Sequence, residues 1–393
     1  MGSSETPSAP RALVNTETLL RRHGEAGERW IAGMWRADPL ADAVVADAKL
    51  AGREVRAFLA GDVAEVTTAS AAALIAQVGA DPDWLERERL DRAADVLVRY
   101  SAQWGLVLGA ASLLRGAINP IAAKPLLLTG RYGSQPAVRS IEVGEWLSQV
   151  VRRGGMAIGA PGFGHTVRVR LIHAHVRRHI EAAGQWDHDA WGVPIPQPYM
   201  AFTLAEFGHI SLAAMAKIGV RLTPAELADV YHLWRYVGYL IGVDEELNPV
   251  GEADQIRIEE LYRLTSPGPD AYSREFVRAL TEGYLAPELA NLLPLPATVG
   301  KPLATTLMYG MSRVFLGEDA ADSLHIPDGV AKHVVRLAAP GLMVLDQART
   351  RLLGRERIAD AAYPIRDREL ARLKAQHAIT HDLVDAVPGA VGH

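Results

Sequence analysis

The hydrophobic positions of this chain recur at the three- and four-residue spacing typical of α-helices. Two helix starts carry capping residues: Asp83 precedes one repeat, and Thr223 followed by Pro224 precedes another. No run alternates with a period of two over enough residues to predict a sheet. The pattern predicts an all-α protein, with helices over residues 19–35, 40–60, 68–78, 83–100, 139–153, 166–180, 200–218, 224–241, 254–264, 272–284, 302–316, 329–339, 342–353 and 366–375.

Breaks rich in proline and glycine separate these helices, but none has the length or polarity of an interdomain linker. We therefore predict one large helical domain over residues 13–381, with a disordered tail at 1–12 and a flexible tail at 382–393. The first residues are small and polar and do not resemble a secretory signal. The longest apolar run, 105–114, is shorter than the roughly 20 residues that cross a bilayer. These features predict a cytoplasmic protein without a membrane span.

Composition excludes several functions. The net charge of −5, with no cluster of Lys and Arg, argues against nucleic acid as a partner. The chain has no cysteine, which excludes disulfides, thiolate-ligated or covalently attached haem, Cys-ligated iron–sulfur clusters and cysteine nucleophiles. A metal in this protein must be held by other side chains, histidine among them. The 49% hydrophobic content is enough to build a large core.

His173 is the candidate metal ligand. In the predicted helix 166–180 it falls on the stripe of Val169, Ile172, Val176 and Ile180, whereas His175 and His179 face the opposite side. An inward imidazole in apolar surroundings suits the axial nitrogen of a noncovalent haem. Arg177, one turn later, can pair with a haem propionate. The alternative is a core histidine bonded to a carbonyl, with Arg177 reaching solvent.

The segment between Asp95 and Glu142 contains no acidic residue and is largely apolar, with isolated cations. It fits the lining of a pocket for an apolar or anionic ligand, or a buried pair of helices whose arginines reach the surface. After Pro136, Arg139 lies on an apolar helical face with Glu142 one turn on. This pair can stand over a bound cofactor, or form an ordinary intrahelical salt bridge.

Two further histidine patterns are weaker. His175 and His179 lie four apart on one face, but Arg168 and Arg178 flank them and repel a dication. The segment from Glu206 to His209 matches one Glu-x-x-His element of a di-iron bundle, yet the chain has no second such element. We interpret the first pair as solvated, and His209 as structural or as part of a pocket wall.

Four segments, in chain order, resemble the family that contains latex clearing protein and the mycophenolic-acid-pathway (MpaB-like) oxygenase. The central segment holds His173 and is similar to the signature helix of that family. The resemblance covers residues 100–250 best and rests on LLLTG at 126–130, VRLIHAHVR at 169–177, WGVPIPQPYM at 191–200 and WRYVGYLIGV at 234–243.

The resemblance implies an all-helical, globin-like domain that holds haem b noncovalently, with His173 as the proximal iron ligand. It also implies an O₂-dependent oxygenase: latex clearing proteins cleave the double bonds of polyisoprene, and the mycophenolic relative cleaves a farnesyl side chain. Arg177 and Arg235 are the expected propionate partners.

One departure from the family concerns the distal side of the haem. The rubber-cleaving members carry Arg-x-x-Lys-Thr, whereas here Glu142 and Val143 follow Arg139 at those positions. This argues against rubber as the substrate and makes Arg139 and Glu142 the candidate catalytic pair. We expect a haem oxygenase acting on O₂ and a hydrophobic small molecule, with cleavage of a C=C bond as its reaction. The alternatives are a haem sensor or carrier without turnover, a haem peroxidase, and a helical interaction protein without cofactor.

Overall fold

Helices are the regular secondary structure of the chain in a computed structural model, which describes residues 8–62, 65–128 and 136–380, apart from the side chains of residues 48, 126 and 127. No strand occurs within those ranges, so the all-α prediction is confirmed. The elements are α1 (Thr16–His23), α2 (Glu25–Gly33), α3 (Pro39–Ala46), α4 (Ala48–Leu59), α5 (Ala69–Gly79), α6 (Arg87–Arg99), α7 (Ser101–Val107), η1 (Leu108–Leu113), α8 (Leu114–Gly116), α9 (Pro120–Leu128), α11 (Pro136–Val150), α12 (Pro161–Ala182), α13 (His188–Trp191), α14 (Gln197–Ala205), η2 (Glu206–Ile210), α15 (Ser211–Lys217), α16 (Pro224–Ile241), α17 (Glu252–Thr265), α18 (Ala271–Leu280), η3 (Thr281–Leu285), α19 (Ala286–Asn291), α20 (Ala297–Leu316), α21 (Glu318–Ser323), α22 (Ala331–Leu353) and α23 (Arg355–Gln376).

The boundaries show where sequence periodicity succeeds and fails. Thr223 forms the predicted cap at the start of α16, in a full capping box with Glu226. The prediction that a helix starts at Asp83 is wrong: the chain makes a turn there, and α6 begins at Arg87. The helix predicted over 19–35 is divided at Gly24, whose φ of 48° stops α1 before α2 begins.

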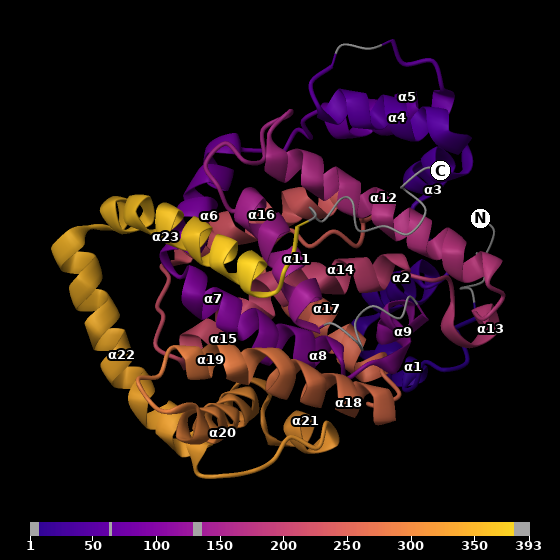
Figure 1. Cartoon of the computed structure of the whole chain (residues 1–393). Helices are drawn as coiled ribbons and strands as arrows, with labels where there is room; N and C mark the ends of the chain where they lie inside the picture. Colours follow the sequence, from indigo (N-terminus) through magenta and orange to yellow (C-terminus); the bar gives the residue numbers. More distant parts are fainter. Residues whose placement is uncertain (1–7, 63–64, 129–135, 381–393) are drawn as a thin grey trace.

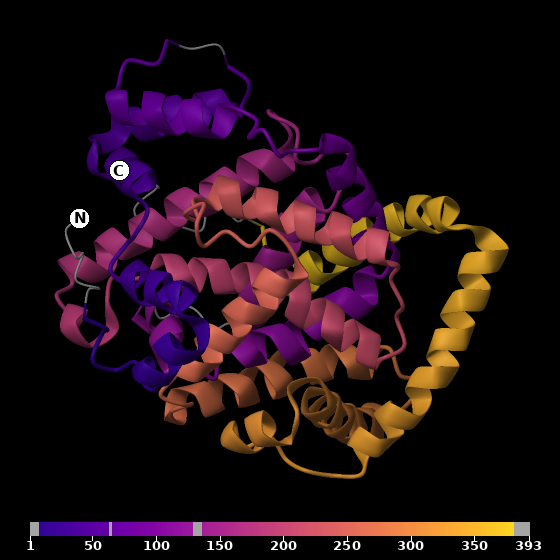
Figure 2. The same ribbon diagram turned by 180° about the vertical axis from the view of Figure 1, so that it is seen from behind.

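The long helix α12 packs against α11, α3, α9 and α16, and α16 packs in turn along α6 (Figure 1). Trp30, Trp234, Tyr236, Tyr262 and Phe163 are the largest fully buried side chains of the core. Helices α4 and α5 project from one end of the molecule, with α3 at their base (Figure 2). The bundle is therefore built around the helix that carries His173.

The last two helices form an arm. α22 runs along one edge of the molecule, packs on α20 and leaves Leu337, Val344 and Leu345 exposed (Figure 1). α23 then returns across the bundle and packs on α6 and α11. Arg153 holds this helix in place by ion pairs with Asp95 on α6 and Asp360 on α23, both at 2.7 Å. The segment after α22 thus covers the central helices.

A buried ion pair fixes α12 against the start of α3. Arg170 Nε and Nη2 donate to Asp38 at 2.6 and 2.9 Å, and both side chains are at most 3% exposed. The same carboxylate caps α3 by accepting from the Ala41 amide. Gly242, at the end of α16, faces the pair with a φ of 85°; a Cβ there would lie 2.5 Å from Asp38 Oδ2.

The ends of the chain bear on the predicted tails. Residues 8–12 make backbone hydrogen bonds to α13, from Arg11 to Asp189 and from Ala12 to Ala190. The tail predicted at 382–393 lies outside the described residues. Among the described helices none is both long and apolar enough to cross a bilayer.

Replacing Asp38 by Asn tests the buried pair. Asn can still cap α3, but Arg170 then remains as an uncompensated buried charge, so we expect the free energy of unfolding to fall by about 3–5 kcal/mol. Urea denaturation followed by circular dichroism gives this value. The matched control is Asp81→Asn, whose carboxylate pairs with Arg87 at the surface; its loss should stay below about 1 kcal/mol. Equal losses in the two variants would contradict the assignment.

Candidate functional site

A cavity of about 600 Å³ opens among the central helices. This is within the roughly 300–1,000 Å³ typical of small-molecule sites, and its wall is mostly aliphatic and aromatic. The wall includes part of the segment without acidic residues, in particular Trp104, Leu108 and Ser112. Of the two interpretations of that segment, the lining of a pocket is therefore correct for these residues. Its cations do not all face the cavity: Arg99 pairs with Glu226, and Arg115 with Glu259.

His173 lies on the wall of this cavity. Val169, Ile172 and Val176, its neighbours on the stripe, also line it, while His175 and His179 are exposed on the other side of α12. The helical geometry inferred from sequence is therefore correct for this segment. It places one imidazole in an apolar chamber.

The imidazole of His173 is kept neutral. Burial, reinforced by the positive charge of Arg177, lowers the pKa of His173 to about 4. A neutral imidazole has the free lone pair that metal ligation requires. Nδ1 is buried without a hydrogen-bond partner among the described residues, although a ligating histidine usually donates its second N–H to an acceptor. The interpretation as a core histidine bonded to a carbonyl finds no such bond in the described part of the chain.

The pair predicted on α11 forms. Arg139 Nη1 lies 2.5 Å from Glu142 Oε2, and the Glu142 side chain is only 3% exposed. Arg139 lines the cavity and raises the local positive potential, which disfavours protonation of His173. Glu142 is not among the residues of the cavity wall, and its carboxylate accepts a hydrogen bond from Arg139.

The two residues predicted to hold the propionates lie elsewhere. Arg177 is buried against Asp42 of α3, with Nη2 at 2.7 Å from the carboxylate, and does not line the cavity. Arg235 stacks on the ring of Trp84, 3.9 Å from its centroid, and is also outside the wall. Helical spacing gave the position of each residue along its helix, but it could not show which neighbour the side chain meets.

A second cation on the wall is absent from the sequence interpretation. Arg366 of α23 lines the cavity together with Glu369, Leu370 and Leu373. Burial lowers the pKa of Arg366, and its Nη1 donates to the Val151 carbonyl at 2.6 Å. Arg139 and Arg366 are the cationic side chains that face this cavity within the described ranges. Arg366 lies in no recognisable sequence motif. It reaches the cavity only because α23 packs back across α6 and α11.

Three π-helical turns, η1, η2 and η3, contribute to the same wall. π turns interrupt α-helices and occur frequently at functional sites. In η2 the wider turn separates Glu206 from His209: Glu206 faces the cavity, while His209 lies 3.7 Å from Glu259 and 3.9 Å from Glu252. The two members of the Glu-x-x-His pattern therefore have different surroundings.

The proline-rich stretch at residues 191–200 is anchored by Gln197. Its amide nitrogen donates to the carbonyls of Ala37 and Gly242, and its carbonyl accepts from the Asp244 amide at 2.8 Å. Next to it, Ile195 lines the cavity with a φ of 52°, a costly conformation for a β-branched residue. Of the LLLTG segment, Thr129 and Gly130 lie outside the described residues.

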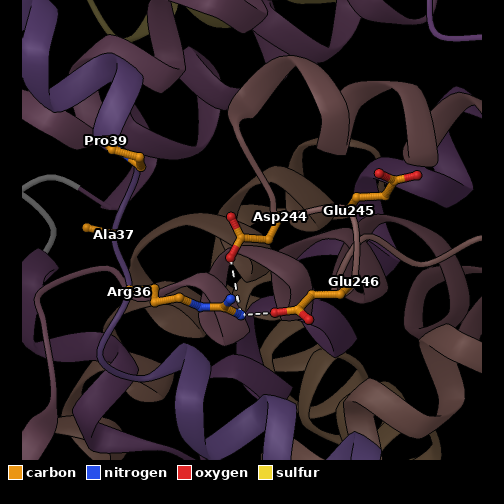
Figure 3. Close-up of a pocket in the computed structure, with 6 residues that line it drawn as sticks. All are labelled: Arg36, Ala37, Pro39, Asp244, Glu245 and Glu246. Carbon is orange, nitrogen blue, oxygen red and sulfur yellow. Dashed lines mark ion pairs between the residues drawn. The ribbon is translucent and has the colours of Figure 1, made fainter.

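A second, open pocket lies on the surface beside this anchor (Figure 3). Arg36 reaches across it to Asp244, with Nη2 and Oδ2 3.2 Å apart, and to Glu246. Figure 3 shows Glu245 pointing away from the arginine. Because Arg36 is already paired with Asp244 and Glu246, we interpret this pocket as a structural contact between the loop at residues 36–39 and the loop at residues 244–246.

Comparison with known proteins agrees with this architecture. Residues 98–345 match the family model described as the catalytic domain of ER-bound oxygenase mpaB/B' and rubber oxygenase. The chain belongs to this oxygenase family. Rubber oxygenase of Streptomyces sp. (strain K30) is 23% identical over 264 residues, which cover 65% of this chain and 59% of the length of that protein. Latex clearing protein in its closed state shares the fold, with a TM-score of 0.63 at 17% identity over 83% of this chain and 88% of that chain.

The family assignment confirms the resemblance found in the sequence. The matched residues contain α11 and α12, and with them Arg139, Glu142 and His173. They end at residue 345, within α22 and before α23. Arg366 therefore reaches the cavity from outside the matched region.

The low pKa of His173 predicts a pH dependence of stability in the cofactor-free protein. The pKa is about 4 in the folded state and 6.5 in the unfolded state, so the unfolded chain binds the proton more readily. The contribution of His173 to the free energy of unfolding should be fully present above pH 6.5. It should fall by on the order of 3 kcal/mol as the pH drops towards 4. Urea titrations at several pH values measure it.

Other groups also titrate in this window, so the comparison between variants is decisive. His173→Gln should remove this component of the pH dependence. His179→Gln, on the exposed side of the same helix, should leave it in place. An unchanged slope in His173→Gln would show that this imidazole is not held neutral by the fold.

Proposed function

We propose that this protein is a haem b-dependent oxygenase that uses O₂ to oxidise a hydrophobic small molecule, with cleavage of a C=C bond as the reaction. The observation that carries the proposal is His173, a neutral imidazole on the wall of a large apolar cavity in a chain of the mpaB and rubber oxygenase family. An apolar cavity suits a porphyrin face and a greasy substrate alike.

The residues present fit a haem. His173 offers a nitrogen that burial keeps unprotonated, and its Nδ1 lacks a hydrogen bond within the described structure. Arg366 offers positive charge at the cavity wall for a propionate. When bound, haem iron supplies the binding and activation of O₂. Arg177 and Arg235 would need to leave Asp42 and Trp84 to serve this purpose.

The side chains around the cavity have their own tasks. The apolar wall excludes water from the substrate, which strengthens every charge interaction inside. Glu142 orients Arg139 through their ion pair, so that the guanidinium is held at the wall. Arg139 can then donate hydrogen bonds to a polar group in the cavity. In this arrangement Arg139 touches the ligand and Glu142 acts through it.

The first test is the absorption spectrum of the protein expressed with a supply of haem. We expect a Soret band in the wild type that is lost or shifted in His173→Ala, because this substitution removes the imidazole that would hold the iron. His175→Ala, which alters an exposed residue of the same helix, should retain the wild-type band. Circular dichroism melting verifies that both variants fold.

The spectrum, together with measurements of oxygen binding and substrate oxidation, distinguishes the candidate functions. A wild type that is colourless and takes up no added haemin would overturn the haem proposal. A Soret band with stable O₂ binding and no oxidation of any alkene would favour a sensor or carrier. Oxidation that requires hydrogen peroxide would favour a peroxidase.

Glu142→Gln tests the pair on α11. Gln keeps the volume but removes the charge that orients Arg139, so we expect oxygen uptake with squalene as the probe alkene to fall by about tenfold at unchanged haem content. Glu145→Gln is the matched control, because its carboxylate pairs with Lys374 at 2.6 Å and not with Arg139. Equal turnover in wild type and Glu142→Gln would remove the pair from the mechanism.

A further inference from the structure

Glu206 places a carboxyl group on the wall of the cavity that contains His173. It begins η2, the π turn between α14 and α15. Its backbone carbonyl accepts a hydrogen bond from Ser112 Oγ of η1 at 2.7 Å, so two of the π turns are joined at this point. The side chain is thereby aimed into the cavity by a local change of helical geometry.

The surroundings of this carboxyl group are apolar and close. Phe202 and Tyr262 stack beside it with ring centroids 3.5 Å apart, and Tyr262 donates its hydroxyl hydrogen to the Gly116 carbonyl at 2.7 Å. Gly116 itself faces the carboxyl, since a Cβ at that position would overlap Glu206 Oε1. The absence of a Cβ at Gly116 leaves room for the acid in its observed position.

The carboxyl group has neither an ion pair nor a hydrogen bond to any residue that the structure describes. Burial alone raises the pKa of Glu206 to about 8, so the group is mainly a neutral acid at pH 7. A neutral carboxylic acid has one O–H donor. This donor has no partner among the described residues, and a ligand oxygen in the cavity can accept its hydrogen.

We propose that Glu206 donates a hydrogen bond to a carbonyl or hydroxyl oxygen of an otherwise hydrophobic substrate. This deepens the proposed function, on which it rests, by naming the substrate class. Pure polyisoprene has no oxygen for this donor. A cationic amine is disfavoured, because the same wall holds two positive charges, Arg139 and Arg366, against the single carboxylate of Glu369.

Three probes with the same chain length separate these ligand classes: methyl decyl ketone, dodecene and dodecylamine. Their dissociation constants are measured by calorimetry on the protein as purified, for wild type, Glu206→Gln and Glu206→Leu. We expect wild type to prefer the ketone to the alkene, and Glu206→Leu to lose about tenfold of that preference. Glu206→Gln should retain most of it, because its amide still donates.

The controls keep the result interpretable. Glu206→Leu removes a carboxyl group that has no partner among the described residues, so the variant should keep the wild-type melting temperature, and a lost preference is then not a lost fold. Infrared difference spectra of wild type minus Glu206→Gln at neutral pH should show the C=O absorption of a protonated acid. His173→Ala, measured with the same probes, should keep the preference for the ketone.

Several results would overturn the proposal: an unchanged preference in Glu206→Leu, tightest binding of the amine, a carboxylate absorption in place of the acid, or no binding of any probe. The proposed function fails separately. A protein that takes up no haem but discriminates ketone from alkene through Glu206 would refute the oxygenase proposal and leave the binding site intact.

Discussion

The ion pair between Arg170 and Asp38 is the constraint on which the rest of the site depends. Two buried charges are tolerated in a protein interior only when their geometry satisfies them, and here two parallel hydrogen bonds do so. The pair lies one turn before His173 and meets the end of α16 at Gly242. It sets the rotation of α12 about its axis, and with it the direction in which the imidazole points. Gln197 joins two of these segments, the start of α3 and the end of α16, through the carbonyls of Ala37 and Gly242.

The cavity beside this helix has a mostly apolar wall with few titratable side chains. Each one is tuned by the absence of water: His173 loses its proton easily, and Glu206 keeps its proton. The pKa of His173 is lowered and the pKa of Glu206 is raised, but the cause is the same, since burial disfavours the charged form of each side chain. The result is a chamber in which Glu206 and His173 are both neutral, and the charged side chains on its wall are Arg139, Arg366 and Glu369. Such a chamber suits substrates that water would solvate poorly.

Sequence alone predicted those parts of the site that depend on a single helix. The stripe of His173 and the contact of Arg139 with Glu142 follow from residues three and four apart, and both are present. The surroundings of Arg177 and Arg235 depend on which helix lies opposite, and periodicity contains no information about that. Arg366 was missed for the same reason, because α23 reaches the cavity only after the long excursion of α22. Glu206 was noticed as part of a di-iron pattern, but the π turn that separates it from His209 leaves no mark in an α-helical count.

The π turns also bear on how this chain is compared with its relatives. A π turn contains one residue more than the α-helical turn it replaces, so η2 is equivalent to a single-residue insertion within a helix. A related protein without that residue would keep the helix and the cavity, yet would present a neighbour of Glu206 to the substrate. Two members of the family can therefore have similar sequences in α14 and α15 and still differ in the side chain that contacts the ligand at the position of Glu206. At this position the presence or absence of the extra residue would bear more directly on specificity than the residue identities on either side.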